Sequence, residues 1–344
     1  KLGKNLKKLG FLITTKKNYS SKKKSVSAII ACYKDVEAIP IMHKRLTNVF
    51  KTLKIEYEII FVNDCSPDNS EEVIKNLSKN DSHIIGISHS RNFGSQMAFR
   101  SGMEISTKDS VVLLDGDLQD PPELIIDFYK KWNEGNDVVY GRRIKRDMSL
   151  FVGLLYKAFY RIFAFFSYIK IPLDAGDFSL MDRKVVLWLL NCPEGDLFIR
   201  GIRAYVGFKQ IGVDYVRPER MFGVSTNNIF KNIEWAKKAI FSFSNAPLTL
   251  LTSVGFFLFF ISLVLSILVL ILRIFYQDLV PKGLTTILLS VLFFGSLNIL
   301  GIGLLGEYIS KIMTEVKKRP RLIRSSTIRD EIISQAMIDV KNKE

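Results

Sequence analysis

Two long uncharged runs near the C-terminus most limit what this chain of 344 residues can fold into. Residues 239–272 are 34 consecutive positions without Asp, Glu, Lys or Arg, and residues 283–306 are 24 more. A helix of about 20 apolar residues crosses the hydrocarbon core of a bilayer. We therefore predict two membrane spans, at 247–272 and 283–306, that form a hairpin within 246–307. The alternative is a buried core hairpin, but residues 250–272 are too uniformly apolar for an amphipathic helix.

The basic residues around the runs predict the orientation of this hairpin. Lysines stand before the first run at 231, 237 and 238, and six basic residues follow the second between 311 and 324. The connecting loop, 274–282, holds only Lys282 and Asp278. Because loops rich in Lys and Arg stay in the cytoplasm, we expect a two-pass membrane protein whose region 25–225 and both termini are cytoplasmic.

Two stretches upstream have the pattern of interfacial helices. Phe151, Leu155 and Phe159 lie on one face of residues 148–171, and Ile229 and Ile233 begin a similar face within 226–245. Amphipathic helices of this kind lie in the headgroup region. The alternative is that they pack on the soluble core.

The net charge of +15 is concentrated in the ends of the chain. Residues 1–24 contain nine lysines and no acid, so the other 320 residues carry only +6. Such a tail binds nucleic acid or anionic lipid, or is simply solvated. No nucleic-acid motif or aromatic-interleaved basic face accompanies it, so we expect no nucleic-acid partner. Basic residues near a membrane attract anionic lipid by about 1 kcal/mol each, and we predict membrane docking through both tails, 1–24 and 308–344.

The region 25–225 alternates between short apolar runs and helix-like segments. The predicted strands are 26–32, 58–62, 84–88, 111–114 and 137–140, and the predicted helices are 37–52, 70–79, 95–106 and 122–133. This alternation is typical of an α/β domain with a Rossmann-like, mostly parallel sheet covered by helices. Asp120 is the predicted N-cap of the last helix, because two prolines and Glu123 follow it.

Polar residues follow these strands, at the edge where open α/β sheets bind ligands. The second strand ends at Asp64, and the fourth at Asp115 and Asp117, followed by Gln119. Oxygen donors of this kind suit Mg²⁺ or Mn²⁺. The alternative for each motif is a purely structural turn whose carboxylates act as caps and bind no ligand. The three cysteines and three histidines have no metal-ligand spacing, and the Walker and G-x-G-x-x-G loops are missing.

The chain resembles family 2 glycosyltransferases of the GT-A fold, and among them the polyisoprenyl-phosphate glycosyltransferases, which include bactoprenol glucosyltransferases and dolichyl-phosphate mannose synthases. The resemblance covers about 25–320. The motifs that carry it are N-D-C-S-P-D at 63–68, R-N-F-G at 91–94, D-G-D-L-Q-D-P-P-E at 115–123, Y-G-R-R at 140–143, D-A-G-D-F at 174–178, R-G at 200–201 and G-V-S at 223–225.

The resemblance implies a role for each residue of the site. The residues implied for the donor nucleotide-sugar are Tyr33, Asp35, Asp64, Arg91, Asp115 and Asp117. The implied ligands of Mg²⁺ or Mn²⁺ are Asp115, Asp117 and Gln119. The implied catalytic residues are Asp177, as a base or a positioning group, with Asp117 and Arg143. The implied acceptor-phosphate residues are Arg200, Arg217, Arg220 and Ser225.

The implied reaction is an inverting transfer of a hexose, with glucose as the first candidate, from a UDP-sugar to undecaprenyl phosphate. The resemblance also implies that the catalytic domain works at the cytoplasmic face of a bacterial inner (plasma) membrane. The product would be a lipid-linked sugar for a separate flippase and for surface glycan modification. A processive polysaccharide synthase is disfavoured because Q-x-x-R-W is missing, and a non-catalytic nucleotide-sugar binder because the acidic motif is intact. A transferase directed to protein or diacylglycerol, the identity of the sugar, and homo-oligomer formation stay open.

Overall fold

The computed structural model describes residues 24–144, 175–192, 197–218, 221–222, 284–317, 319–329 and 332–335, with five isolated positions between 253 and 264. Several predictions lie outside the described residues. These are the tail 1–23, the two interfacial helices, most of the first span, Arg220 and Ser225.

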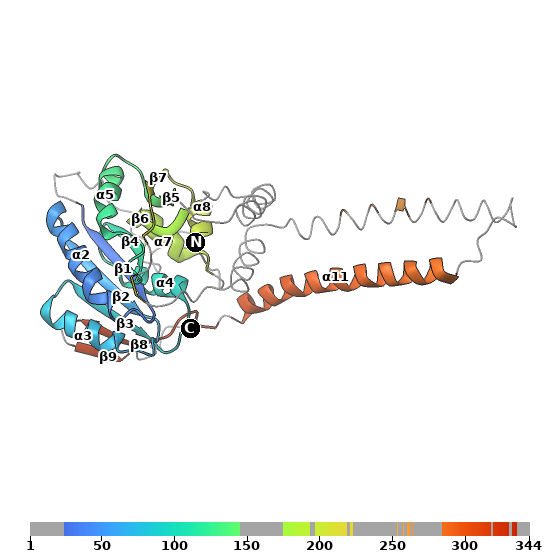
Figure 1. Cartoon of the computed structure of the whole chain (residues 1–344), viewed down its shortest axis with the longest axis horizontal. Coiled ribbons are helices and arrows are strands. Elements are labelled where there is room, and N and C mark those ends of the chain that lie inside the picture. Colours follow the sequence, from blue (N-terminus) through green and yellow to red (C-terminus); the bar gives the residue numbers. More distant parts are fainter. Residues whose placement is uncertain are drawn as a thin grey trace, which may run out of the picture.

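One nine-stranded sheet forms the centre of the described fold, in the order β7-β5-β6-β4-β1-β2-β3-β8-β9 (Figure 1). The strands are β1 Val26–Cys32, β2 Tyr57–Asn63, β3 Ile84–His89, β4 Ser110–Asp115, β5 Val138–Arg143, β6 Ala175–Asp182, β7 Gln210–Tyr215, β8 Arg324–Arg329 and β9 Ile332–Gln335. The five strands predicted from the apolar runs are β1 to β5, each found within three residues of its expected bounds.

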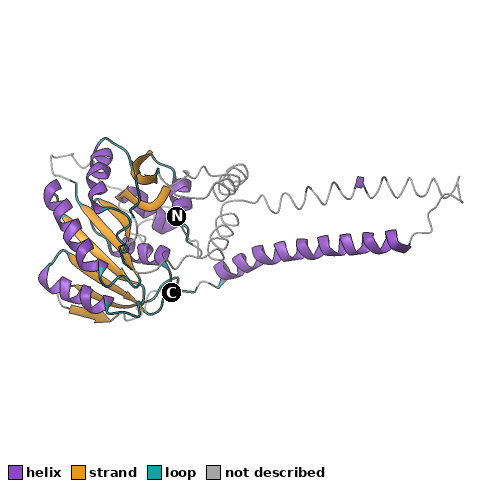
Figure 2. Ribbon diagram, in the orientation of Figure 1, coloured by secondary structure: helices purple, strands orange, loops and turns teal. Residues whose placement is uncertain are grey.

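Helices cover both faces of this sheet (Figure 2). They are α2 Ala38–Leu53, α3 Ser70–Asn80, α4 Ser95–Ile105, the short 3₁₀ helix η2 Pro122–Leu124, α5 Ile125–Asn133, α7 Arg183–Asn191 and α8 Ile199–Val206. Side chains of α2, α3 and α5 pack in one apolar core, and those of α4, α7 and α8 pack in another. Successive residues of β1 divide between the two cores, with Ala28 and Ile30 in the first and Ile29 in the second. A strand buried on both faces reads as a continuous apolar run, which is why β1 to β4 are visible in the sequence.

The prediction of a mostly parallel sheet needs a correction. Four of the eight pairings between the described strands are antiparallel, because β6 runs between β4 and β5 in the opposite direction and β8 and β9 extend the β3 edge. The central strands β4, β1, β2 and β3 are parallel, as expected. The sheet is therefore a mixed α/β sheet.

The predicted N-cap at Asp120 is also wrong. The residue before η2 is Pro121, and no side chain caps the helix. Asp120 is 1% exposed and accepts a hydrogen bond from the Tyr215 hydroxyl instead. A buried carboxylate needs a hydrogen-bond partner of this kind. Because Asp120 is buried, it bonds to Tyr215 and does not cap the helix.

A long helix, α11 (Leu284–Val316), extends away from the sheet (Figure 1), and the chain then returns to form β8 beside β3. The second predicted span, 283–306, coincides with most of α11. Within the described part of the chain there is no helix both long and apolar enough to cross a membrane.

Candidate active site

The loops that follow β1, β2 and β4 meet at one edge of the sheet. These strands are parallel and in register, with Ala31 beside Asp115 and Cys32 beside Asn63. Their loops begin with Tyr33, Asp64 and Gly116. The Asp64 amide donates to the carbonyl of Cys32, and the Gly116 amide donates to that of Ala31, at 3.0 and 2.9 Å. The backbone itself thus holds the three loops together.

Each of these loops contains a non-glycine residue in the left-handed region. The φ angles are 62° at Lys34, 54° at Cys65 and 60° at Leu118. Such conformations are uncommon for residues with a side chain and cluster at functional sites. The sharp turns bring the side chains next to them over the edge of the sheet.

Gly116 is required by a close approach between two of these loops. A Cβ atom at this position would lie 2.8 Å from Asp35 Oδ2 and 2.9 Å from the Ala31 carbonyl oxygen. Asp35 Oδ2 also accepts the Tyr33 amide at 2.9 Å. The predicted nucleotide-binding residues Tyr33 and Asp35 therefore lie directly beside the acidic loop after β4.

Three carboxylates gather in that loop. Asp117 and Asp120 are 7% and 1% exposed, and Asp115 stands at the end of β4. The guanidinium of Arg217, just after β7, reaches all three, with nitrogen-to-oxygen distances of 4.0 Å to Asp115, 3.8 Å to Asp117 and 3.9 Å to Asp120. Gln119 donates to the Pro218 carbonyl at 3.3 Å. The segment after β7 thus packs onto the acidic loop.

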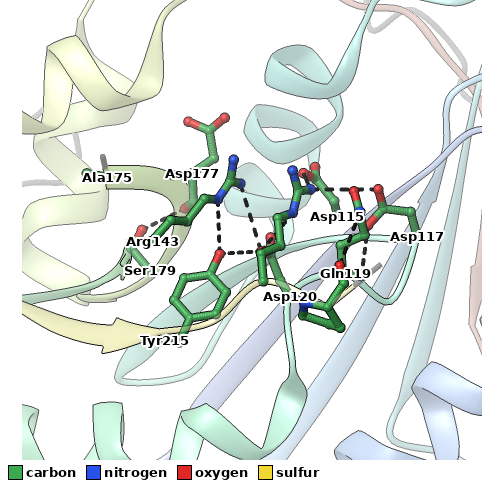
Figure 3. A network of polar contacts seen from close by, with 12 residues as sticks. Asp115, Asp117, Gln119, Asp120, Arg143, Ala175, Asp177, Ser179 and Tyr215 are labelled. Carbon is green, nitrogen blue, oxygen red and sulfur yellow. Dashed lines mark hydrogen bonds and ion pairs between the residues drawn. The ribbon is translucent and has the colours of Figure 1, made fainter. Parts of the chain in front are cut away.

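Asp120 connects this cluster to Arg143 through Tyr215 (Figure 3). The Tyr215 hydroxyl donates to Asp120 Oδ1 at 2.7 Å and accepts from Arg143 Nε at 3.2 Å. Arg143 Nη2 lies 4.0 Å from Asp120 Oδ1. Burial, with the Asp120 charge next, raises the pKa of Tyr215 far above its usual value, so the hydroxyl keeps its proton.

The acidic cluster has the character of a cation site. Burial and the charges of the neighbouring carboxylates raise the pKa of Asp115 well above its ordinary value, and burial raises that of Asp120. A positive charge placed among such groups relieves this cost. The described residues contain no group of three His, Cys, Asp or Glu side chains arranged to hold a metal ion. The oxygen-rich donor set nevertheless suits Mg²⁺ or Mn²⁺. Arg217 occupies the same neighbourhood, and its buried Nε has no hydrogen-bond partner among the described residues.

Asp177, on β6, is held by two other elements. Arg200 Nε donates to its Oδ1 at 3.1 Å and Arg200 Nη2 to its Oδ2 at 3.2 Å. Gln96, at the start of α4, donates to Oδ2 at 2.9 Å and accepts the Ile199 amide of α8 at 2.8 Å. Burial alone would raise the pKa of Asp177, but the charges and hydrogen bonds of Arg200, with Arg203 and Gln96, hold it below its usual value. Asp177 is therefore an anion at neutral pH and a weak base.

Asp64 is turned toward the protein. Its Oδ1 accepts the Phe93 amide at 2.9 Å, its Oδ2 accepts the Gly94 amide at 2.7 Å, and His89 Nδ1 lies 2.8 Å from Oδ1. The carboxylate thus fixes the loop that follows β3. Arg91 in that loop is exposed, with its guanidinium 4.1 Å from the centre of the Phe93 ring.

The structure brings most of the predicted site residues to one edge. Asp115, Asp117, Gln119 and Arg217 form one group, and Arg143, Asp177 and Arg200 form a second beside it. Contact of Asp64 and Arg91 with a nucleotide stays a prediction, as do the assigned roles of the others. Sequence reasoning missed Gln96, Tyr215 and Arg203 as site residues. The only available signal was for Arg203, an arginine three positions after Arg200 on a short apolar helix.

Several known proteins resemble this chain in sequence. The sequence model of the family described as glycosyl transferase family 2 matches residues 27–188, from β1 into α7. An uncharacterised glycosyltransferase of Bacillus subtilis is 38% identical over 86% of this chain and 92% of its own length. A bactoprenol glucosyl transferase of Shigella phage SfX is 37% identical over 88% of this chain and 99% of its own length.

Solved structures with a related fold are more distant. Mannosyl-3-phosphoglycerate synthase from Rubrobacter xylanophilus aligns with 15% identity and a TM-score of 0.44 over 74% of this chain and 78% of its own. Glucosyl-3-phosphoglycerate synthase from Mycobacterium tuberculosis, solved with Mn²⁺ and UDP, aligns with 17% identity and a TM-score of 0.38 over 63% and 78%. The family match and the relatives that align along most of the chain lead to one conclusion: this protein is a glycosyltransferase that belongs to glycosyl transferase family 2.

Proposed function

We propose that this protein transfers a hexose, with glucose as the first candidate, from a UDP-sugar to a polyisoprenyl phosphate such as undecaprenyl phosphate. The observation that carries the proposal is the pairing of an acidic group, Asp115, Asp117 and Asp120, with an arginine group, Arg143 and Arg200, at one sheet edge. The first suits a cation with a diphosphate and the second suits a phosphate. The resemblance to a phage bactoprenol glucosyl transferase along nearly its whole length supports the same acceptor.

The donor would bind over the loops after β1, β2 and β4. Tyr33, Asp35 and Asp64 would receive the nucleoside, and Asp115, Asp117 and Gln119 would hold Mg²⁺ or Mn²⁺. A bound divalent cation neutralises the charge that develops on the leaving diphosphate. Arg217, now beside the carboxylates, would turn to the phosphates, which its fork fits in two hydrogen bonds.

The acceptor would bring its own nucleophile. The second pKa of a phosphate monoester is near 6, so its oxygen is largely ionised at pH 7 and needs no strong base. An oxygen of the lipid phosphate attacks the anomeric carbon, the bond from that carbon to the diphosphate breaks, and UDP leaves with the electron pair. Attack from the opposite face inverts the anomeric centre. Arg143 and Arg200 would orient the phosphate, and Asp177 would orient Arg200.

A membrane location is part of the proposal and rests on the sequence. The uncharged runs 239–272 and 283–306 are long enough to span a bilayer. Exposed apolar side chains on α11, among them Ile287, Val291 and Phe294, suit a lipid environment. The active site would then face the cytoplasm of a bacterial cell, close to the headgroup of the acceptor, and a separate flippase would move the product across the membrane.

The test measures glycolipid formation by the purified full chain with polyprenyl phosphate, Mg²⁺ or Mn²⁺ and a panel of UDP-sugars. We expect one labelled lipid, with UDP-glucose as the first donor to try. Asp117→Ala should lower its formation by at least about 100-fold, the range seen when a preorganised electrostatic group is removed. Asp127→Ala, at an exposed position of α5, is the matched control and should keep wild-type activity. No lipid product with any donor, or an unimpaired Asp117→Ala variant, contradicts the proposal.

A further inference from the structure

Arg203, on α8, is an arginine with no exposed surface. Its Nη2 donates to the Gly176 carbonyl at 3.4 Å, and its guanidinium lies 5.1 Å from the centre of the Tyr140 ring. Its Nε and Nη1 are buried and have no hydrogen-bond partner in the described part of the chain. Burial lowers the pKa of Arg203 to about 10, so the side chain keeps its charge at neutral pH.

This arrangement is a poor way to stabilise a fold. Arginines are almost never fully buried unless they are paired, and each unmet buried donor costs free energy. An apolar side chain of similar volume often stabilises such a position as well or better. Features that break the rules of stable packing concentrate at functional sites. The residues around Arg203 therefore indicate its function.

Arg203 contacts the same turn of the chain, Gly176–Asp177 on β6, as Arg200 does. Arg200 and Arg203 reach the segment Gly176–Asp177 from α8, and Asp177 supplies one negative charge against these two positive ones. Arg143 approaches from β5, with its Nη2 only 3.2 Å from the point where a Cβ on Gly176 would stand. Arg143 has its own partners in Tyr215 and Asp120. Arg200 therefore depends on a carboxylate whose segment Arg203 holds from inside the core.

We infer that Arg203 is a positioning residue for an anionic acceptor: it holds the Gly176–Asp177 segment from inside the core, so that Asp177 keeps Arg200 in place for the lipid phosphate. This inference rests on the proposed function and names a residue that acts without touching substrate. Charges in a water-poor interior act over longer distances than at the surface, and fixed charges that need no reorganisation are the effective ones in catalysis.

The test compares Arg203→Met, which removes the charge and keeps the length, with Arg203→Lys, which keeps the charge. Arg183→Met is the control, because Arg183 is a partly buried arginine on α7 that donates to the Lys108 carbonyl away from the turn. Two quantities are measured for each variant: the KM values for polyprenyl phosphate and for the UDP-sugar, and binding of a short-chain polyprenyl phosphate without any donor.

We expect Arg203→Met to weaken acceptor binding and raise the acceptor KM about tenfold, the effect of losing one charge at moderate distance. The donor KM should stay within about twofold, the unfolding temperature should be unchanged or higher, and Arg203→Lys should recover most of the acceptor binding. Arg183→Met should leave both KM values unchanged.

Three results overturn the inference. The first is unchanged acceptor binding in Arg203→Met, the second is an equal rise of both KM values, and the third is an Arg203→Lys variant as weak as Arg203→Met. If Arg203→Met does not fold, the stability expected for it is wrong. The inference then depends on Arg203→Lys alone, which has to bind the acceptor with normal affinity. A wild type that binds polyprenyl phosphate but transfers no sugar contradicts the proposed function instead, and the binding comparison still decides the role of Arg203.

Discussion

At the scale of single residues, the environment of each carboxylate separates its role from that of its neighbours. Burial raises the pKa values of Asp115 and Asp120, and neighbouring carboxylates raise that of Asp115 further, so both sites favour a cation. Asp177 is also buried, but the arginines beside it outweigh that effect, lower its pKa and keep it an anion at neutral pH. The sequence does not reveal this difference, because the charge around a residue depends on elements that are distant in the chain.

The pH dependence of the reaction tests the role of Asp177. Because its folded pKa is depressed, the carboxylate is ionised above its usual value of 3.8 and loses its charge only as the pH falls further. The ionisation of the acceptor phosphate, with a second pKa near 6, should therefore produce the acidic limb of kcat/KM. We expect Asp177→Asn to be slower but to keep this limb. A limb that disappears in Asp177→Asn would instead identify Asp177 as the general base.

At the scale of elements, the sequence predicted β1 to β5 and the helices between them because these strands are buried on both faces and the helices are amphipathic. It missed β6 and β7, whose runs Ala175–Asp182 and Gln210–Tyr215 mix polar and apolar residues. It also missed β8, which pairs with β9 and with β3, the latter more than 230 residues away in the chain. The placement of Asp177 on β6 and of Arg217 just after β7 depends on two of these missed strands, so the site could be predicted residue by residue but not as a geometry.

The loop after β3 depends on Asp64. Asp64→Asn keeps the size of the side chain but sets an amide group against the amides of Phe93 and Gly94. Leaving buried donors unmet costs about 1–3 kcal/mol, and we expect the free energy of unfolding in urea to fall by that amount. Asp127→Asn, on the surface of α5, should change it by less than about 0.5 kcal/mol. An equal effect of the two substitutions would show that Asp64 does not hold the loop.

The strand β8 should be part of the stable catalytic domain. Ile328 on β8 is 1% exposed and packs over Gly86 of β3, where an added Cβ would lie 3.3 Å from it. Ile328→Ala should destabilise the protein by about 2–5 kcal/mol, the usual cost of such a cavity. The control is Ile323→Ala, since Ile323 is 49% exposed just before the strand, and its effect should be small. Thermal unfolding of both variants measures the difference, and similar unfolding temperatures would contradict a structural role for β8.

At the scale of the whole molecule, the proposed function requires a cytoplasmic active site next to a membrane hairpin. The β8 strand follows α11 and pairs with β3 of the catalytic sheet, so the sheet and the long helix are connected by only a short segment, 317–323. A lipid acceptor makes sense of such an arrangement, because its phosphate stays at the membrane surface while its tail stays in the bilayer. The basic ends of the chain would add attraction to anionic lipid.

The orientation of the hairpin can be measured by cysteine labelling in intact cells. A cysteine at Gln277, in the predicted outer loop, should react with a membrane-impermeant maleimide. A cysteine at Asp127 should react only after the cells are permeabilised, and the exposed native Cys65 is an internal control for the same side. Labelling of Asp127→Cys in intact cells would contradict the proposed cytoplasmic side of the domain. No labelling of Gln277→Cys in intact cells would contradict the proposed outer loop.

The choice of acceptor is the most direct test of the proposed transfer to polyprenyl phosphate. The purified protein is incubated with labelled UDP-glucose and Mn²⁺ together with polyprenyl phosphate, unphosphorylated polyprenol or diacylglycerol, and the labelled lipid is identified by mass spectrometry. We expect one hexosyl product, formed only from polyprenyl phosphate, because the positive charges of Arg143 and Arg200 favour an anionic acceptor. Transfer to diacylglycerol or to polyprenol at a comparable rate would contradict it.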